Sequence, residues 1–308
     1  MPPNTGNPSE ARVDTVAFYA FDTMALSKHW QVTAGLRWDD YDVDFASTTL
    51  ATGAVTELGT SDGVLSWQTG LVYKPRENGS IYLAYGTSFD PSFDAGNTGV
   101  ALVDGATAVN NPSLDPEESR NYELGTKWDL AGGRLGITAA IFRTEKTNAR
   151  TRDAATNDPI VLEGEQQVDG FELSLVGSLT QRWSVFGGYV YMDSEIEASR
   201  AAGETGNALV LTPESTFNLW ATFAPVRKLQ LGIGTQFVDN AFRNALNTTS
   251  VPSYWLVDAM AEYGVTDRLT LQLNGTNLAD EEYVDRVGGG HFIPGPGRLV
   301  SLTARLTF

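Results

Sequence analysis

The sequence predicts an all-β protein, an antiparallel up-and-down transmembrane β-barrel. Three observations predict it. Apolar and polar residues alternate with a period of two along the whole 308-residue chain, as in strands with one apolar and one polar face. About thirteen segments alternate in this way, and several reach the roughly ten residues of a tilted membrane-spanning strand. Short and long connections also alternate without exception, which is typical of a barrel with tight turns at one rim and long loops at the other.

The alternation is clearest toward the end of the chain. Leu269, Leu271 and Leu273 share one face of their segment, and the last segment repeats the pattern up to Phe308. We expect these faces, with Leu302 and Leu306, to contact lipid. The expected strands lie near residues 13–26, 30–45, 63–73, 80–89, 117–130, 134–148, 166–179, 182–197, 215–224, 228–239, 253–265, 268–279 and 296–308. The expected long connections are 46–62, 90–116, 149–165, 198–214, 240–252 and 280–295.

Composition argues against several classes of protein. No window contains the eighteen or so apolar residues of a membrane helix, and the mean hydropathy of −0.19 suits a barrel whose lumen-facing residues are polar. The chain has no cysteine and only two histidines, His29 and His291. Disulfides, thiol chemistry and a histidine-rich metal site are therefore not expected. The net charge of −17 argues against nucleic acid as a partner, because nucleic-acid binding needs a basic face.

Several blocks of sequence carry a resemblance to a known family. The segment from Leu271 to Tyr283, then Pro294-Gly-Pro-Gly-Arg298 and the terminal strand, resembles the closing region of TonB-dependent receptors. The block Asn111-Pro-Ser-Leu-Asp-Pro-Glu-Glu-Ser-Arg-Asn-Tyr-Glu-Leu-Gly-Thr-Lys-Trp128 is similar to their ferric-catecholate siderophore branch. Order and spacing agree from about residue 13 to residue 308.

The resemblance implies an iron-uptake receptor in the bacterial outer membrane. In the family, barrel and plug bind a ferric siderophore, and the TonB complex acts through the plug; no covalently bound cofactor is implied. The family's barrel has 22 strands, about nine more than this chain offers, and the plug is absent here. We therefore expect an incomplete barrel and a fragment. A terminal Phe on an amphipathic strand resembles the signal read by the barrel assembly machinery, so Phe308 is expected to be that signal.

The start of the chain bears on export. Met1-Pro-Pro-Asn-Thr-Gly-Asn-Pro8 has neither the basic nor the apolar region of a signal peptide. Either the protein is not exported, or this start is not the natural one. We expect residues 1–12 to form an irregular segment and residues 13–308 to form the C-terminal portion of the barrel.

Candidate ligand contacts are basic and aromatic residues near the long connections. A ferric catecholate is anionic and aromatic, so guanidinium groups and aromatic rings suit it. The alternative is that these side chains are simply solvated, and the sequence leaves both interpretations open. The candidates are Arg143, Lys146, Arg150, Arg152, Phe242, Arg243 and His291.

Other features have simpler explanations. Trp30, Trp128 and Trp183 lie beside short turns, where an interfacial aromatic belt is expected. The glycine-rich run 288–297 lacks the Lys-Ser/Thr pair of a phosphate-binding loop, so we expect a flexible loop. The carboxylates at 280–282 are adjacent and do not converge on an extended chain, so we expect a solvated loop start and no metal site. No catalytic residues are expected, because only His291 lies near the long loops and a triad needs more partners.

Two rival interpretations remain at this stage. A passive porin or structural barrel is awkward to build from thirteen strands with such long loops. A soluble surface β-protein gives no reason for the alternation of loop lengths.

Overall fold

The computed structural model describes residues 8–90, 102–103, 106–107, 115–152, 159–288 and 291–308. No helix within these ranges is long and apolar enough to cross a membrane. The strands are β1 (Ser9–Ala25), β2 (Trp30–Thr48), β3 (Val55–Arg76), β4 (Gly79–Asp90), β5 (Leu102–Val103), β6 (Ala106–Thr107), β7 (Glu117–Leu130), β8 (Leu135–Arg152), β9 (Pro159–Ser178), β10 (Trp183–Ala198), β11 (Ser215–Val226), β12 (Leu229–Val238), β13 (Ala241–Phe242), β14 (Ser250–Val251), β15 (Tyr254–Gly264), β16 (Leu269–Thr276), β17 (Val284–Gly288), β18 (His291–Pro294) and β19 (Leu299–Leu306).

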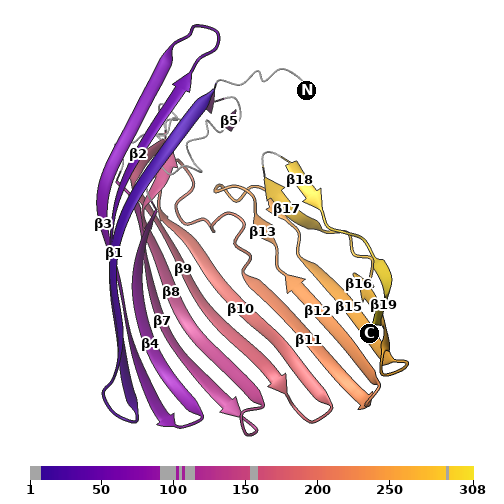
Figure 1. Cartoon of the computed structure of the whole chain (residues 1–308). Helices are drawn as coiled ribbons and strands as arrows, with labels where there is room; N and C mark the ends of the chain where they lie inside the picture. Colours follow the sequence, from indigo (N-terminus) through magenta and orange to yellow (C-terminus); the bar gives the residue numbers. More distant parts are fainter. Residues whose placement is uncertain (1–7, 91–101, 104–105, 108–114, 153–158, 289–290) are drawn as a thin grey trace.

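Thirteen of these strands form one antiparallel sheet. Each main strand pairs with the next one along the chain, in the order β1-β2-β3-β4-β7-β8-β9-β10-β11-β12-β15-β16-β19. The sheet curves, with the tight turns along the lower rim and the long connections along the upper rim (Figure 1). The expected all-β, antiparallel, up-and-down architecture is confirmed.

The strand register gathers large apolar side chains on one face. In one row across the sheet, Leu71 lies opposite Leu83, Leu83 opposite Leu124, Leu124 opposite Ile141 and Ile141 opposite Phe171. These five side chains are 37–56% exposed. Because side chains alternate along each strand, a slip of one residue would send this whole row to the opposite face. The register therefore presents a continuous apolar surface.

Very little of this apolar surface is buried within the protein. The buried apolar residues of the described chain are Tyr41, Val43, Phe45, Ala140, Ala149 and Ile196. A water-soluble domain of this size would bury a sizeable core. A sheet that instead exposes its apolar face is suited to contact with lipid.

Aromatic side chains form two bands on the apolar face. Near the short turns, the rings of Trp30 and Tyr73 lie 4.6 Å apart, and those of Trp183 and Phe223 lie 4.5 Å apart. Near the long connections, Trp67, Tyr85 and Tyr122 follow one another at 4.6 and 4.9 Å, and Phe237 contacts Trp255 at 4.7 Å. Paired aromatic girdles of this kind mark the two interfaces of a membrane barrel.

The β2–β3 hairpin extends beyond the rest of the sheet (Figure 1). The long connection expected at 46–62 is wrong, because strand pairing continues to Thr48 and Val55. The reason is local packing: Tyr41, Val43 and Phe45 continue the alternation and are 1–8% exposed, with Leu58 and Val64 packed against them. β1 likewise begins earlier than expected, at Ser9, inside the segment expected to be irregular. Ser9 pairs with Ser47 of β2.

Other long connections also contain more structure than expected. β8 and β9 extend to Arg152 and from Pro159, and the hairpins β13–β14 and β17–β18 lie inside the connections at 240–252 and 280–295. Strands this short have almost no periodicity, which is why alternation does not reveal them.

The sheet remains open. β1 and β19 are its two edges and do not pair with each other. Because every neighbouring pair is antiparallel, the first and thirteenth strands run in the same direction, and joining them would make a parallel pair. This confirms the expected incomplete barrel.

Candidate ligand-binding mouth

Two long connections are joined at the upper rim. The side chain of Asn247 accepts a hydrogen bond from Ala208 N at 2.8 Å and donates one to Ala208 O at 3.0 Å. Asn207 donates to Ala245 O at 2.8 Å, and Leu211 N donates to Phe242 O at 2.8 Å. The β10–β11 and β12–β15 connections are thus held together by a set of bonds that we name the loop clamp, made by Asn207, Ala208, Leu211, Phe242, Ala245 and Asn247.

The loop clamp positions Phe242 and Arg243. Phe242 is half-buried in β13, and Arg243 is exposed immediately after it. The backbone of Arg243 is fixed by a 2.9 Å hydrogen bond from its N–H to Thr249 O. Its guanidinium has no ion-pair partner among the described residues. This braced loop therefore carries an exposed cation and, next to it in sequence, an aromatic residue.

The last connection is organised by Asn277, which is only 4% exposed. Its side chain accepts a hydrogen bond from Glu281 N at 2.8 Å and donates one to Glu281 O at 2.9 Å. It also donates to Pro296 O at 3.1 Å. Asp280 forms an ion pair with Arg298 at 3.3 Å. The carboxylates at 280–282 therefore begin a structured loop, and within the described residues no group of three or more His, Cys, Asp or Glu could hold a metal ion.

His291 lies in the β17–β18 hairpin above this loop. It is exposed, and its backbone lies opposite Gly288. Just before the hairpin, the Tyr283 ring lies 4.5 Å from that of Tyr254 and so close to Gly295 that a Cβ there would overlap it. Burial, followed by the charges of Asp285 and Asp258, raises the pKa of the Tyr283 phenol. These contacts make Tyr283 a packing group at this end of the mouth.

The candidates on β8 do not share a face. Arg143 lies opposite Tyr122 and Asp169, on the apolar face above Ile141. It donates two 2.7 Å hydrogen bonds to Asp169. Strand alternation therefore turns Arg143 outward, so it does not join the other candidates at the inner side of the mouth.

Lys146 lies on the opposite, polar face of β8. Its Nζ is 2.9 Å from Glu117 Oε2, and Glu117 is 8% exposed. Arg150 and Arg152 belong to the end of the same strand, and their side chains lie outside the described residues. Of the β8 candidates, Lys146 is thus the one whose described side chain is on the inner side of the sheet.

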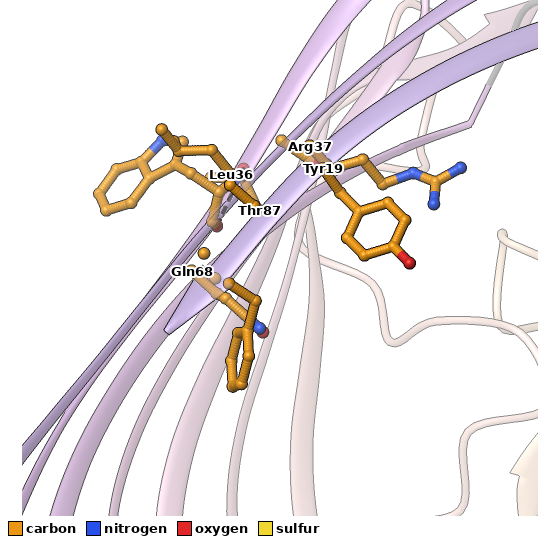
Figure 2. Close-up of a pocket in the computed structure, with 11 residues that line it drawn as sticks. Tyr19, Leu36, Arg37, Gln68 and Thr87 are labelled. Atoms are coloured by element: carbon orange, nitrogen blue, oxygen red, sulfur yellow. Dashed lines mark hydrogen bonds between the residues drawn. The ribbon is translucent and has the colours of Figure 1, made fainter. Parts of the chain in front are cut away.

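The sequence interpretation missed a pocket near β1 to β4. A pocket of about 380 Å³ lies where β3 separates from β4, with Tyr19, Arg37 and Gln68 among its lining residues. Figure 2 shows Leu36 on one side of the ribbon and Tyr19 and Arg37 on the other. Arg37 is neutralised by two hydrogen bonds to Asp39, at 2.6 and 2.7 Å. Their spacing of two residues was the available signal, since it places both on one face.

A second group of side chains on the inner face lies further along the sheet. The Tyr82 hydroxyl donates to Glu123, and Lys127 Nζ lies 5.1 Å from the centre of the Tyr82 ring. These residues come from the neighbouring strands β4 and β7. At this position the inner face is therefore polar and internally bonded, in contrast to the outer one.

Comparison with known proteins agrees with this geometry. The family described as TonB dependent receptor-like, beta-barrel matches residues 1–278. The chain belongs to the TonB-dependent receptor β-barrel family. That family is one of receptors of the bacterial outer membrane, and this places the chain there. The long-loop rim described above is accordingly the extracellular mouth of a TonB-dependent receptor barrel, and the tight turns face the periplasm.

Two curated relatives illustrate the match. The chain is 37% identical over 295 residues to the probable TonB-dependent siderophore receptor PiuA of Acinetobacter baumannii, covering 92% of this chain and 39% of that protein. It is 30% identical over 329 residues to the catecholate siderophore receptor Fiu of Escherichia coli K12, covering 98% and 43%. The chain thus spans about two fifths of the length of these relatives.

Solved structures give the same result. The crystal structure of PiuA superposes with a TM-score of 0.88 at 34% identity, covering 97% of this chain and 44% of that one. The closed form of the ferric-catecholate import receptor Fiu gives a TM-score of 0.85 at 28% identity, covering 97% and 45%. The open thirteen-stranded sheet therefore corresponds to part of a complete receptor barrel.

Proposed function

We propose that these strands belong to an outer-membrane receptor that takes up ferric siderophores of the catecholate type, driven by TonB. The observation that supports this most is the similarity, over nearly the whole chain, to receptors named for siderophores and catecholates. The family match favours this function over the passive porin or structural barrel.

Charge and shape at the mouth suit such a ligand. Arg243 is exposed and follows Phe242 in sequence, and backbone hydrogen bonds hold both residues on the braced loop. His291 stands in the last extracellular hairpin and Lys146 on the inner face of β8. A cation beside an aromatic ring recognises an anionic, aromatic iron complex. Arg143 is excluded from this proposed set, because it faces outward and is paired with Asp169.

Other parts of the proposed function lie outside this chain or at its end. Coupling to TonB is proposed to run through the plug of the intact receptor, and no covalent cofactor or catalytic role is proposed. Outer-membrane lipid contacts the apolar face. Phe308, which follows β19 and is fully exposed, is proposed as the assembly signal read by the barrel assembly machinery.

An uptake experiment tests the proposal. The receptor that carries these residues is expressed in a strain lacking its own catecholate receptors, and radioactive iron is supplied as a catecholate or as a hydroxamate complex. We expect catecholate uptake that disappears in a tonB mutant. Uptake of both complexes without TonB would favour a passive pore.

A further inference from the structure

The short-turn rim carries a ring of positive charge. Every one of the six tight turns has at least one Lys or Arg in it or within the last three residues of the strand before it. We name these residues the basic rim: Lys28, Lys74, Arg76, Arg134, Arg182, Arg227, Lys228 and Arg268. In the same stretches there are half as many carboxylates: Glu77, Asp129, Glu262 and Asp267.

This distribution opposes the overall charge of the protein. The chain has 38 acidic and 21 basic residues and a net charge of −17. The acidic residues concentrate toward the extracellular side, as at Asp40, Asp42 and Asp44 on β2. Asp40 is ten residues from Trp30, or roughly 33 Å along the strand at about 3.3 Å per residue. Since the Debye length in physiological salt is about 8 Å, these carboxylates do not cancel the rim's positive charge.

The cations of the basic rim are unpaired. Seven of the eight are exposed and Lys74 is partly exposed, and none forms an ion pair with another described residue. The ion pairs found in the described chain involve other cations: Arg12, Arg37, Arg120, Arg143, Lys146, Arg286 and Arg298. Paired cations thus lie away from the periplasmic rim, and free cations gather on it.

The basic rim lies directly below the lower aromatic band. Lys28 is two residues from Trp30, and Arg182 immediately precedes Trp183. Tyr73, whose ring lies 4.6 Å from that of Trp30, is next to Lys74 in sequence. Aromatic rings settle at the headgroup level of a membrane, which places the adjacent ammonium and guanidinium groups among the phosphates.

We propose that the basic rim is a binding surface for anionic phospholipid headgroups of the inner leaflet of the outer membrane. Charge complementarity selects phosphatidylglycerol over the zwitterionic phosphatidylethanolamine. The aromatic band fixes the depth of the barrel in the membrane. Acyl chains then lie along the apolar face, and headgroups contact the cations. This surface is independent of the ligand at the mouth, because it lies at the opposite rim.

Lipid binding to the detergent-purified receptor that carries these residues tests the proposal. Native mass spectrometry measures bound phosphatidylglycerol and phosphatidylethanolamine over a titration of each. The rim variant combines Lys28→Gln, Arg182→Gln, Lys228→Gln and Arg268→Gln, whose side chains make no hydrogen bond in the described structure. The control removes the same number of charges at the other end of the barrel and combines Arg12→Gln, Arg120→Gln, Arg286→Gln and Arg298→Gln.

We expect the wild-type receptor to prefer phosphatidylglycerol, and a rim cation to strengthen the binding of the anionic lipid next to it by up to about fivefold. The rim variant should bind it at least about tenfold more weakly, while the control stays within about twofold of wild type. Raising the salt concentration should weaken binding, and glycerol phosphate without acyl chains should not displace the lipid.

Equal binding of both lipids by the wild type would overturn the proposal. So would equal losses in both variants, or displacement by glycerol phosphate, which would indicate a plain anion site. If the basic rim instead binds an acidic partner protein, the rim variant should bind lipid as well as the wild type does. That result also rejects the proposal. If the four-site variant does not assemble, Arg182→Gln with Arg268→Gln provides the same comparison, with an expected loss of about fivefold or more.

Discussion

Residue positions one apart on a strand have opposite environments in this protein. Leu273 is 47% exposed on the apolar face, opposite Ala261 and Leu302. Its neighbour Gln272 lies on the polar face and donates a 2.9 Å hydrogen bond to Asn274. The same substitution at these two positions should therefore have very different consequences.

Leu273→Arg should lower the free energy of unfolding by about 2–4 kcal/mol, the cost of a cation near the middle of the lipid face. Gln272→Arg, on the lumen side, should cost far less. Denaturant titration of the receptor in lipid vesicles measures both. Equal tolerance of the two variants would contradict the assignment of faces.

The free cation at the mouth gives a second residue-scale prediction. Arg243→Gln should weaken binding of a ferric catecholate, because it removes an exposed charge that follows Phe242 in sequence. A contact between a cation and an aromatic ring of the ligand contributes about 0.5–2 kcal/mol, so the affinity should fall at least a fewfold. Arg143→Gln is the matched control, since that guanidinium faces outward onto Asp169. Fluorescence quenching titrations give both affinities. A larger loss for Arg143→Gln would reverse the assignment of these residues.

Elements at the extracellular rim depend on the loop clamp. Asn247 has a positive φ of 53°. Its side chain links two connections by bonding Ala208, which is 39 residues away in sequence. Asn247→Ala removes both bonds to Ala208, and the partly buried backbone groups left unpaired should cost about 1 kcal/mol. The connection at 199–214 should then be cut faster by protease added to intact cells.

Asn244→Ala is the control for the clamp, because the Asn244 side chain bonds only Thr248 in its own loop. Its cleavage rate should remain near that of the wild type. Cleavage that accelerates equally in both variants would show that the clamp does not brace the mouth.

The orientation of the elements is testable because the chain has no cysteine. Ala202→Cys lies in an upper connection and Gln181→Cys in a short turn, and both positions are exposed. A membrane-impermeant maleimide should label Cys at 202 in intact cells, and at 181 only after the outer membrane is permeabilised. Labelling of 181 alone in intact cells would invert the topology.

The whole molecule was largely predictable because its dominant signal has a period of two. Glu117–Leu130 was located to the residue, and the thirteen main strands appear in the expected order. The β2–β3 extension was not predicted, since Thr56-Glu-Leu-Gly-Thr60 has weak alternation and is held by pairing with β2. Tertiary context of that kind is not available to a local pattern.

The mouth was less predictable than the sheet. Proximity in sequence grouped Arg143 with Lys146, yet a spacing of three residues places them on opposite faces of a strand. The loop clamp joins Asn207 to Ala245, and no periodicity signals such a contact. Short hairpins such as β13–β14 escape detection for the same reason.

The central claim is that this chain forms a lipid-facing part of a TonB-dependent receptor barrel whose thirteen strands do not close on themselves. The two edges, β1 and β19, leave N–H and C=O groups unpaired, which is costly in lipid. The direct measurement is gel mobility, with and without heating, of the 308-residue chain exported alone to the outer membrane, together with its protease resistance. We predict degradation or aggregation and no heat-modifiable band. A compact, protease-resistant monomer that shifts on heating would contradict the claim.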